Sequence, residues 1–295
     1  MKKTIQYSAL ALLILASCNN ASQSEEKNDR MKEIANDSLI SKNGYSEVNG
    51  IKMYYEIYGQ GKSLVLLHGG GSTIQSTFGR LIPLLALQRQ LICVELQAHG
   101  RTSDRNSEIS FEQDADDVAT LLKNLNIQKT DFFGFSNGGT VALQIAIRHP
   151  EMCNKIIAGS VLLKRNGTLP QFWQFMKSGT FEQMPQQYKD AFLKVNSDSE
   201  KLLTMYQKCA NRMNNFKDFS DGQLMVIKSP VLFINGNEDV ALPEHIVAMS
   251  RLIPNSKLAI VPGGHGEYIG EITALKPGYK NSDFIVPIIE NFLDK

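Results

Sequence analysis

The sequence has few cysteines, a single tryptophan and no excess of charge of either sign. Its 295 residues include 31 Lys and Arg against 30 Asp and Glu, and no basic stripe departs from that balance. A nucleic-acid-binding surface needs concentrated positive charge, so we expect no nucleic-acid partner. The hydrophobic fraction of 42% and the charged fraction of 21% are those of a globular protein and argue against a disordered chain or a coiled coil.

Long hydrophobic runs are also missing. The apolar run at residues 9–16 is far shorter than the roughly 20 residues that span a bilayer. Two lysines precede it and small residues follow, which is the pattern of a cleaved secretory signal. The sequence Leu-Ala-Ser-Cys ending at Cys18 resembles the lipobox of bacterial lipoproteins, whose cysteine is lipidated after cleavage. We therefore expect residues 1–17 to be a signal peptide and Cys18 to carry lipid, with an ordinary secretory signal as the alternative.

Residues 18–44 contain no aromatic residue and few apolar ones, so they predict a flexible tether. Together with Cys18 they predict an exported protein anchored to a bacterial membrane, at the outer membrane or the periplasmic face. Three cysteines remain, at positions 93, 153 and 209. An odd number without metal-ligand spacing predicts neither a disulfide framework nor a zinc site, and no cofactor is expected.

The body of the chain alternates short apolar runs with helical patterns. An Asn-Gly pair at positions 49 and 50 joins the first two runs and predicts a β-hairpin. Strand and helix in alternation indicate an α/β sheet with helices on both faces and ligands at the carboxyl ends of the strands. The expected strands are residues 45–48, 51–58, 64–67, 91–94, 131–133, 156–158, 231–234 and 258–261.

Residues 163–228 interrupt this alternation, because they show helical stretches and no convincing strand. The segment holds nine aromatic residues. We expect most of these rings to form a small core and two or three to line an apolar pocket. The segment is therefore predicted to be a helical cap inserted into a core made of residues 45–162 and 229–295.

Two glycine-containing motifs follow predicted strands. The G-F-S-N-G motif at residues 134–138 lies between a strand and a helix, where small neighbours permit a strained turn that exposes Ser136 as a nucleophile. The H-G-G-G motif at residues 68–71 follows another strand, and its glycines leave backbone N–H groups free to face an oxyanion. Such motifs at two strand ends predict an acyl-transfer site.

A serine hydroxyl needs a base, and the base needs a carboxylate to orient it. Among the five histidines, His265 lies in a glycine-rich loop just after the last strand. Asp239 follows the strand at residues 231–234, and Glu238 is the alternative carboxylate. The predicted catalytic residues are therefore Ser136, His265 and Asp239.

The order of these three residues, the H-G-G-G turn and the helical insertion resemble the α/β-hydrolase fold superfamily. This resemblance implies an eight-stranded, mostly parallel sheet with a helical cap. It also implies that the backbone N–H groups of Gly70 and Asn137 form the oxyanion hole. The segment 95–103 resembles a glycine-containing loop of the family, from which Glu95 and Ala98 depart, and we interpret it as structural support.

A serine at position 136 disfavours the haloalkane dehalogenases and most epoxide hydrolases of this fold, which use aspartate there. The sequence predicts a serine hydrolase that cleaves a small, fairly apolar carboxyl ester, lactone or thioester through an acyl-enzyme. Carbon–carbon bond hydrolysis, perhydrolysis and aminopeptidase activity remain open, as does a non-catalytic ligand-binding role. The expected partners are a small-molecule substrate and, through Cys18, a membrane.

Overall fold

The computed structural model describes residues 40–295. The predicted signal peptide, Cys18 and most of the predicted tether lie outside these residues. Strand β1 (Ile40–Val48) begins before the expected position 45, so the predicted end of the tether at residue 44 is wrong. Most of the added residues are polar or glycine and exposed on an edge strand, and their backbone pairs with β2 (Ile51–Tyr58). Backbone pairing needs no apolar side chains, so the composition of this segment gave no sign of a strand.

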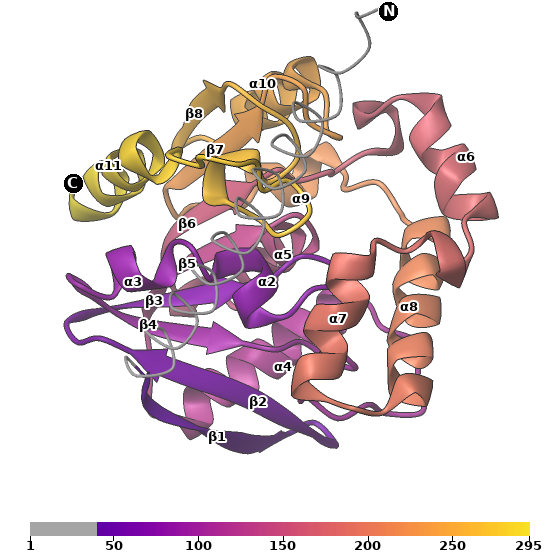
Figure 1. Cartoon of the computed structure of the whole chain (residues 1–295). Coiled ribbons are helices and arrows are strands. Elements are labelled where there is room, and N and C mark those ends of the chain that lie inside the picture. Colours follow the sequence, from indigo (N-terminus) through magenta and orange to yellow (C-terminus); the bar gives the residue numbers. More distant parts are fainter. Residues whose placement is uncertain (1–39) are drawn as a thin grey trace, which may run out of the picture. The chain divides into compact units, whose positions relative to one another are not determined.

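All eight predicted strands are present in one sheet, in the order β1-β2-β4-β3-β5-β6-β7-β8 (Figure 1). Strand β2 runs antiparallel to both β1 and β4, and the remaining neighbours are parallel. The predicted eight-stranded, mostly parallel sheet is thus confirmed. The other strands are β3 (Lys62–Leu67), β4 (Arg89–Val94), β5 (Thr130–Phe135), β6 (Cys153–Gly159), β7 (Val231–Gly236) and β8 (Ser256–Val261).

The hairpin between β1 and β2 turns at Asn49 and Gly50. Both residues have positive φ, 44° and 87°, as a two-residue turn of this hand requires. Asparagine and glycine tolerate this region better than other residues, which explains why the pair was a reliable signal.

Alternate residues of each central strand enter two separate hydrophobic clusters. In β3, Val65 and Leu67 belong to one cluster, whereas Leu64 and Leu66 belong to the other. This period of two places one set on each face of the sheet. Both faces are therefore buried, which explains the continuous apolar runs in the sequence.

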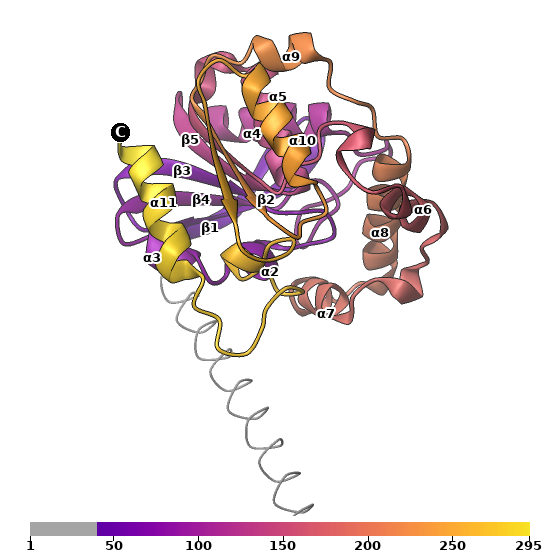
Figure 2. The ribbon, with the colours of Figure 1, turned by 90° about the horizontal axis from the view of Figure 1, so that it is seen from above.

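Helices cover both faces of the sheet, as Figure 2 shows. The first cluster includes residues of α4 (Phe111–Asn124), α5 (Asn137–Arg148) and α10 (Pro243–Leu252). The second includes residues of α2 (Ile74–Phe78), α3 (Ile82–Leu85) and α11 (Ser282–Asp294). The arrangement is a three-layered α/β fold, with the strand ends free to carry side chains into a site.

Between β6 and β7 the chain forms helices without an intervening strand, and we refer to residues 163–228 as the cap. Part of the cap has a small core of its own, in which Met184, Phe192, Leu202 and Met205 pack with Ala98 of the body. The helical elements are η2 (Arg165–Gly167), α6 (Pro170–Ser178), η3 (Phe181–Gln183), α7 (Gln186–Val195), α8 (Ser199–Asn214) and α9 (Asp221–Met225).

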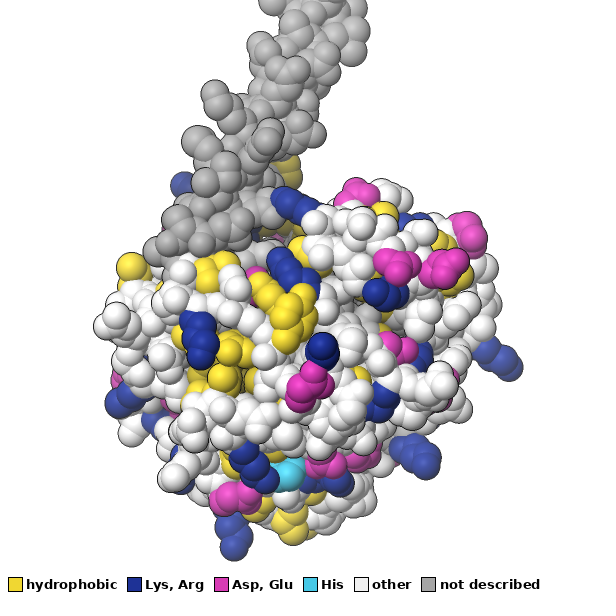
Figure 3. All heavy atoms as spheres, turned by 90° about the horizontal axis from the view of Figure 1, so that it is seen from below, with side chains coloured by type: hydrophobic (Ala, Val, Ile, Leu, Met, Phe, Trp, Pro, Cys, Tyr) yellow, Lys and Arg dark blue, Asp and Glu magenta, His cyan; other side chains and the backbone are white. Residues whose placement is uncertain are grey.

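The described residues include no membrane-spanning helix, and the face in Figure 3 has no concentration of charge of one sign. Among residues 40–295, no helix is both long and apolar enough to cross a bilayer. Basic and acidic side chains are interspersed on that face.

Candidate active site

Ser136 occupies a strained turn between β5 and α5. Its φ of 53° and ψ of −120° are unusual for a residue with a side chain. The turn is possible because glycines flank it: a Cβ atom on Gly134 would lie 2.1 Å from the Gly138 carbonyl oxygen, and one on Gly138 would lie 2.1 Å from the Leu67 carbonyl oxygen. The close packing of this turn holds the serine at the carboxyl end of the sheet.

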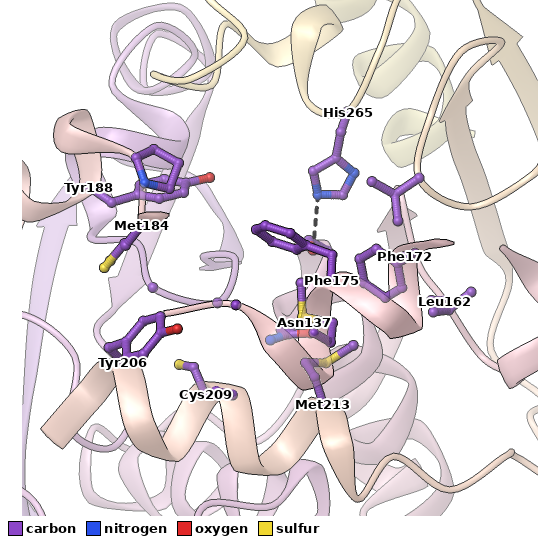
Figure 4. A pocket seen from close by; sticks show the side chains of 18 of the residues that line it. Asn137, Leu162, Phe172, Phe175, Met184, Tyr188, Tyr206, Cys209, Met213 and His265 are labelled. Atoms are coloured by element: carbon purple, nitrogen blue, oxygen red, sulfur yellow. Dashed lines mark hydrogen bonds between the residues drawn. The ribbon is translucent and has the colours of Figure 1, made fainter. Parts of the chain in front are cut away.

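Ser136, His265 and Asp239, which the sequence predicted as catalytic residues, form a hydrogen-bonded series with His265 in the middle. The Ser136 Oγ is 3.1 Å from Nε2 of His265 (dashed in Figure 4), and Nδ1 of His265 is 2.6 Å from Oδ1 of Asp239. They come from the ends of β5, β8 and β7, which the parallel sheet brings to one edge. Glu238, the alternative carboxylate, is exposed.

Asp239 is held by donors from three directions. Its side chain is fully buried and accepts hydrogen bonds from the Ser160 hydroxyl at 2.6 Å, the Gly236 N–H at 3.1 Å and the Val240 N–H at 2.7 Å. Burial opposes ionisation of this carboxyl group, but the His265 charge and these donors outweigh it and lower the pKa of Asp239. Asp239 is therefore a fixed anion.

The neighbours of the His265 imidazole determine which of its two nitrogens carries the proton. Because Nδ1 faces the anionic Asp239, that nitrogen donates its proton and Nε2 is left to accept one from Ser136. Burial favours the neutral ring, but the charges of Asp239 and, to a smaller extent, Glu271 outweigh it and raise the pKa of His265. The ring also packs against Phe135, with centroids 4.8 Å apart.

Gly70 and Asn137, the predicted oxyanion-hole residues, lie side by side next to Ser136. A Cβ atom on Gly70 would be 2.3 Å from Nδ2 of Asn137, and both residues line the same cavity as Ser136. Among the described residues, neither backbone N–H donates to another atom of the chain. Both are therefore free to receive an oxyanion.

Gly71, the last glycine of the motif, is engaged elsewhere. Its N–H donates to Nε2 of His99 at 3.1 Å, and the other ring nitrogen of His99 lies 2.8 Å from the Gln97 carbonyl oxygen. Burial lowers the pKa of His99 to about 4, so the ring is neutral near pH 7 and Nε2 is an acceptor. His99 thus fixes the glycine turn from the segment interpreted as structural support.

Two further histidines have structural partners. Nε2 of His68 accepts the Leu96 N–H at 3.1 Å, and Nε2 of His245 accepts the Leu163 N–H at 3.1 Å. Burial lowers the pKa of both rings, to about 4 for His245. These side chains join backbone segments, and neither lies against Ser136.

A cavity of about 420 Å³ opens above Ser136, between the strand ends and the cap. Figure 4 shows α8 below it, Tyr188 and Met184 on one side, and Phe172 and Phe175 on the other. We expected two or three cap aromatics here, but five line the cavity, because α6, α7 and α8 all contribute residues to its lining. They are Phe172, Phe175, Tyr188, Tyr206 and Phe216, and four methionines (176, 184, 205 and 213) join them.

Several residues that build the site were not predicted. Ser160 follows β6 and bonds Asp239, and Tyr268 lies 3.0 Å from the Ser160 hydroxyl. The position of Ser160 at a strand end was a usable signal, whereas Tyr268 had none. Among residues 40–295, no group of three His, Cys, Asp or Glu side chains could hold a metal ion.

Comparison with known proteins identifies the family. Residues 62–217, more than half of the chain, match the alpha/beta hydrolase fold. The chain belongs to this family.

Three known proteins illustrate the relationship. The uncharacterized hydrolase YraK of Bacillus subtilis is 29% identical over 140 residues, which cover 46% of this chain and 51% of YraK, so the chain spans about half of that relative. The serine hydrolase BPHL of Homo sapiens is 26% identical over 74% of this chain and 77% of BPHL. The enol-lactonase of Burkholderia xenovorans LB400 has a TM-score of 0.66 at 17% identity, over 85% of this chain and 100% of that chain, and shows the shared fold.

Proposed function

We propose that this chain is a serine hydrolase that cleaves a neutral, largely apolar carboxyl ester, or the related lactone or thioester. The observation that carries the proposal is the hydrogen-bonded series Ser136–His265–Asp239 opening into an apolar cavity. A nucleophile, a base and an orienting carboxylate in this order are the requirements of acyl transfer. The similarity to the serine hydrolase BPHL supports the same chemistry.

In the first half-reaction, the Ser136 Oγ attacks the carbonyl carbon while Nε2 of His265 takes the hydroxyl proton. Asp239 stabilises the imidazolium that forms. The N–H groups of Gly70 and Asn137 donate to the oxyanion of the tetrahedral intermediate. His265 then gives its proton to the leaving group, at the oxygen of an alcohol or at the sulfur of a thiol, and an acyl-enzyme remains.

In the second half-reaction, water replaces the alcohol. His265 removes a proton from the water as it attacks the acyl carbonyl, and the same two N–H groups receive the second oxyanion. Collapse of the intermediate returns the proton to Ser136 and releases the carboxylic acid.

The cavity lining argues for a neutral substrate. No Lys, Arg, Asp or Glu is among the residues that line it, so nothing there would pair with a charged acyl or alcohol group. Burying an unpaired charge is costly, so a substrate with a carboxylate inside this cavity is disfavoured. The volume of about 420 Å³ suits a small ester rather than a polymer.

The proposal is tested with the chain lacking residues 1–18, assayed on p-nitrophenyl esters of increasing acyl length. We expect measurable turnover on neutral acyl chains and at least about tenfold lower kcat/KM when the acyl chain ends in a carboxylate. A fluorophosphonate should label the protein, since it reacts with an activated serine. An absence of labelling would contradict catalysis and favour a ligand-binding role.

We also propose that the mature protein is exported and held at a bacterial membrane by lipid on Cys18. A run of eight apolar residues that is cleaved off cannot anchor the chain, and a near-neutral protein has little attraction for anionic lipids. Acyl chains would have to supply the attachment, and two or more chains anchor stably.

Cys18→Ala is expected to abolish incorporation of labelled fatty acid, because it removes the only proposed acceptor. The variant should accumulate as an unprocessed precursor or as a soluble exported form, with esterase activity per molecule unchanged. Metabolic labelling and membrane fractionation measure this. Labelled fatty acid in the variant, or a fully soluble wild-type protein, would contradict the anchor.

A further inference from the structure

A second carboxylate, Glu271, lies directly behind the loop that carries His265. Its side chain is completely buried, and its backbone N–H donates to the carbonyl oxygen of Gly266 at 3.1 Å. A Cβ atom on Gly266 would lie 2.6 Å from Cβ of Glu271, so this glycine, with φ of 75°, permits the close approach. Glu271 is thus packed against the residue that follows His265.

The carboxylate of Glu271 is only partly satisfied. Its Oε2 accepts the N–H of Thr273 at 2.8 Å and the hydroxyl of Thr273 at 2.6 Å. Its Oε1 is buried and makes no hydrogen bond of standard geometry, and the same holds for the hydroxyl of Ser72. The phenol of Tyr188, from cap helix α7, faces Ser72, Glu271 and Thr273. Burying a carboxylate with an incomplete set of hydrogen bonds lowers the free energy of unfolding, and a functional role for Glu271 would offset that loss.

The charged groups around this loop indicate that Glu271 acts on His265. Two carboxylates act on the His265 imidazole, Asp239, which is hydrogen-bonded to it, and Glu271, and the charge of each raises the pKa of His265. Glu267 is directed to the exposed ammonium of Lys276, 3.0 Å away. Arg80 also packs on this loop, at Gly270.

We propose that Glu271 is a positioning residue that acts through His265: it holds the histidine loop and favours the protonated imidazole formed during each half-reaction. Tyr188 brings the cap against the same carboxylate. The inference rests on the proposed function, because His265 must be the base for Glu271 to matter in this way. An imidazolium facing two anions forms more readily than one facing a single anion.

The test follows the rate at which a fluorophosphonate labels Ser136 between about pH 5 and pH 9. Labelling needs unprotonated His265, so the wild-type rate should fall on the acid side with a midpoint above 6.5. Glu271→Gln removes the charge and should move this midpoint to lower pH by about half a unit to one unit. The amide keeps an acceptor for Thr273 and gains a donor for Ser72 or Tyr188, so we expect this variant to fold.

Glu267→Gln is the matched control, since it removes a carboxylate from the same loop that is paired with the ammonium of Lys276. The midpoint of Glu267→Gln should stay at the wild-type value. Glu271→Asp keeps the charge, so its midpoint should lie close to that of the wild type. Glu271→Met provides a second neutral variant. An unmoved midpoint in a folded neutral variant, or an equal shift in Glu267→Gln, would overturn the proposal.

Two other outcomes are distinguishable. Failure of both neutral variants to fold, judged by circular dichroism, would assign Glu271 to folding alone and also overturn the proposal. Wild-type protein that does not react with the fluorophosphonate would contradict the serine hydrolase itself, before Glu271 is considered.

Discussion

Ser136→Ala is expected to lower kcat/KM for ester hydrolysis by about four to six orders of magnitude and to abolish fluorophosphonate labelling. In the proposed mechanism the Ser136 hydroxyl forms the covalent bond, and no other hydroxyl lies within reach of His265 Nε2 in the described structure. The N–H groups of Gly70 and Asn137, the proposed oxyanion hole, remain in the variant and would account for a residual rate over water.

Folding should be unaffected by this substitution. Alanine also has a Cβ atom, so the strain at a φ of 53° is the same in both proteins. A change in melting temperature of less than about 2 °C is expected, because only one hydrogen bond of a partly exposed hydroxyl is lost. Ser229→Ala, which removes a hydroxyl bonded to the Cys153 carbonyl, is a control that should retain labelling. Residual activity of Ser136→Ala within about tenfold of wild type would contradict the assignment.

Asp239→Asn is expected to reduce kcat/KM by about four orders of magnitude. The amide nitrogen of asparagine can donate to Nδ1 of His265, which would place the ring proton on Nε2. Nε2 would then be a donor and could not accept the Ser136 proton. The hydrolysis rate near neutral pH measures the effect, and circular dichroism checks that the fold is retained.

The neighbouring carboxylate provides the control for this variant. Glu238 is exposed and precedes Asp239 in the same turn, so Glu238→Gln should change kcat/KM by less than about threefold. If Glu238→Gln were far more damaging than Asp239→Asn, the orienting carboxylate would be Glu238.

Local signals were sufficient for the parts of this protein that depend on sequence neighbours. Strands buried on both faces appear as continuous apolar runs, and the serine turn needs glycine at two fixed positions. The start of β1 was missed because an edge strand is formed by pairing with β2 and not by its own side chains. A strand of this kind leaves little mark in composition.

Contacts between distant segments explain the residues that were missed. Ser160 and Tyr268 are far apart in the sequence, and only the packing of β6 beside β7 brings the serine to Asp239. Ala98, a departure from the family loop, has a φ of 65° and so adopts a conformation that glycine would adopt more easily. Its methyl group packs in the small core of the cap, which compensates for that backbone geometry.

The four methionines around the cavity affect how the protein would discriminate among substrates. Their unbranched thioether chains rotate about three bonds at low cost in free energy, so they can rearrange around bound molecules of different shape. A wall of this composition selects by size and polarity and is tolerant of branching or ring shape. Reaction at the fixed serine would then accept a range of acyl groups, and fidelity would depend on the rigid aromatic side chains that share the wall.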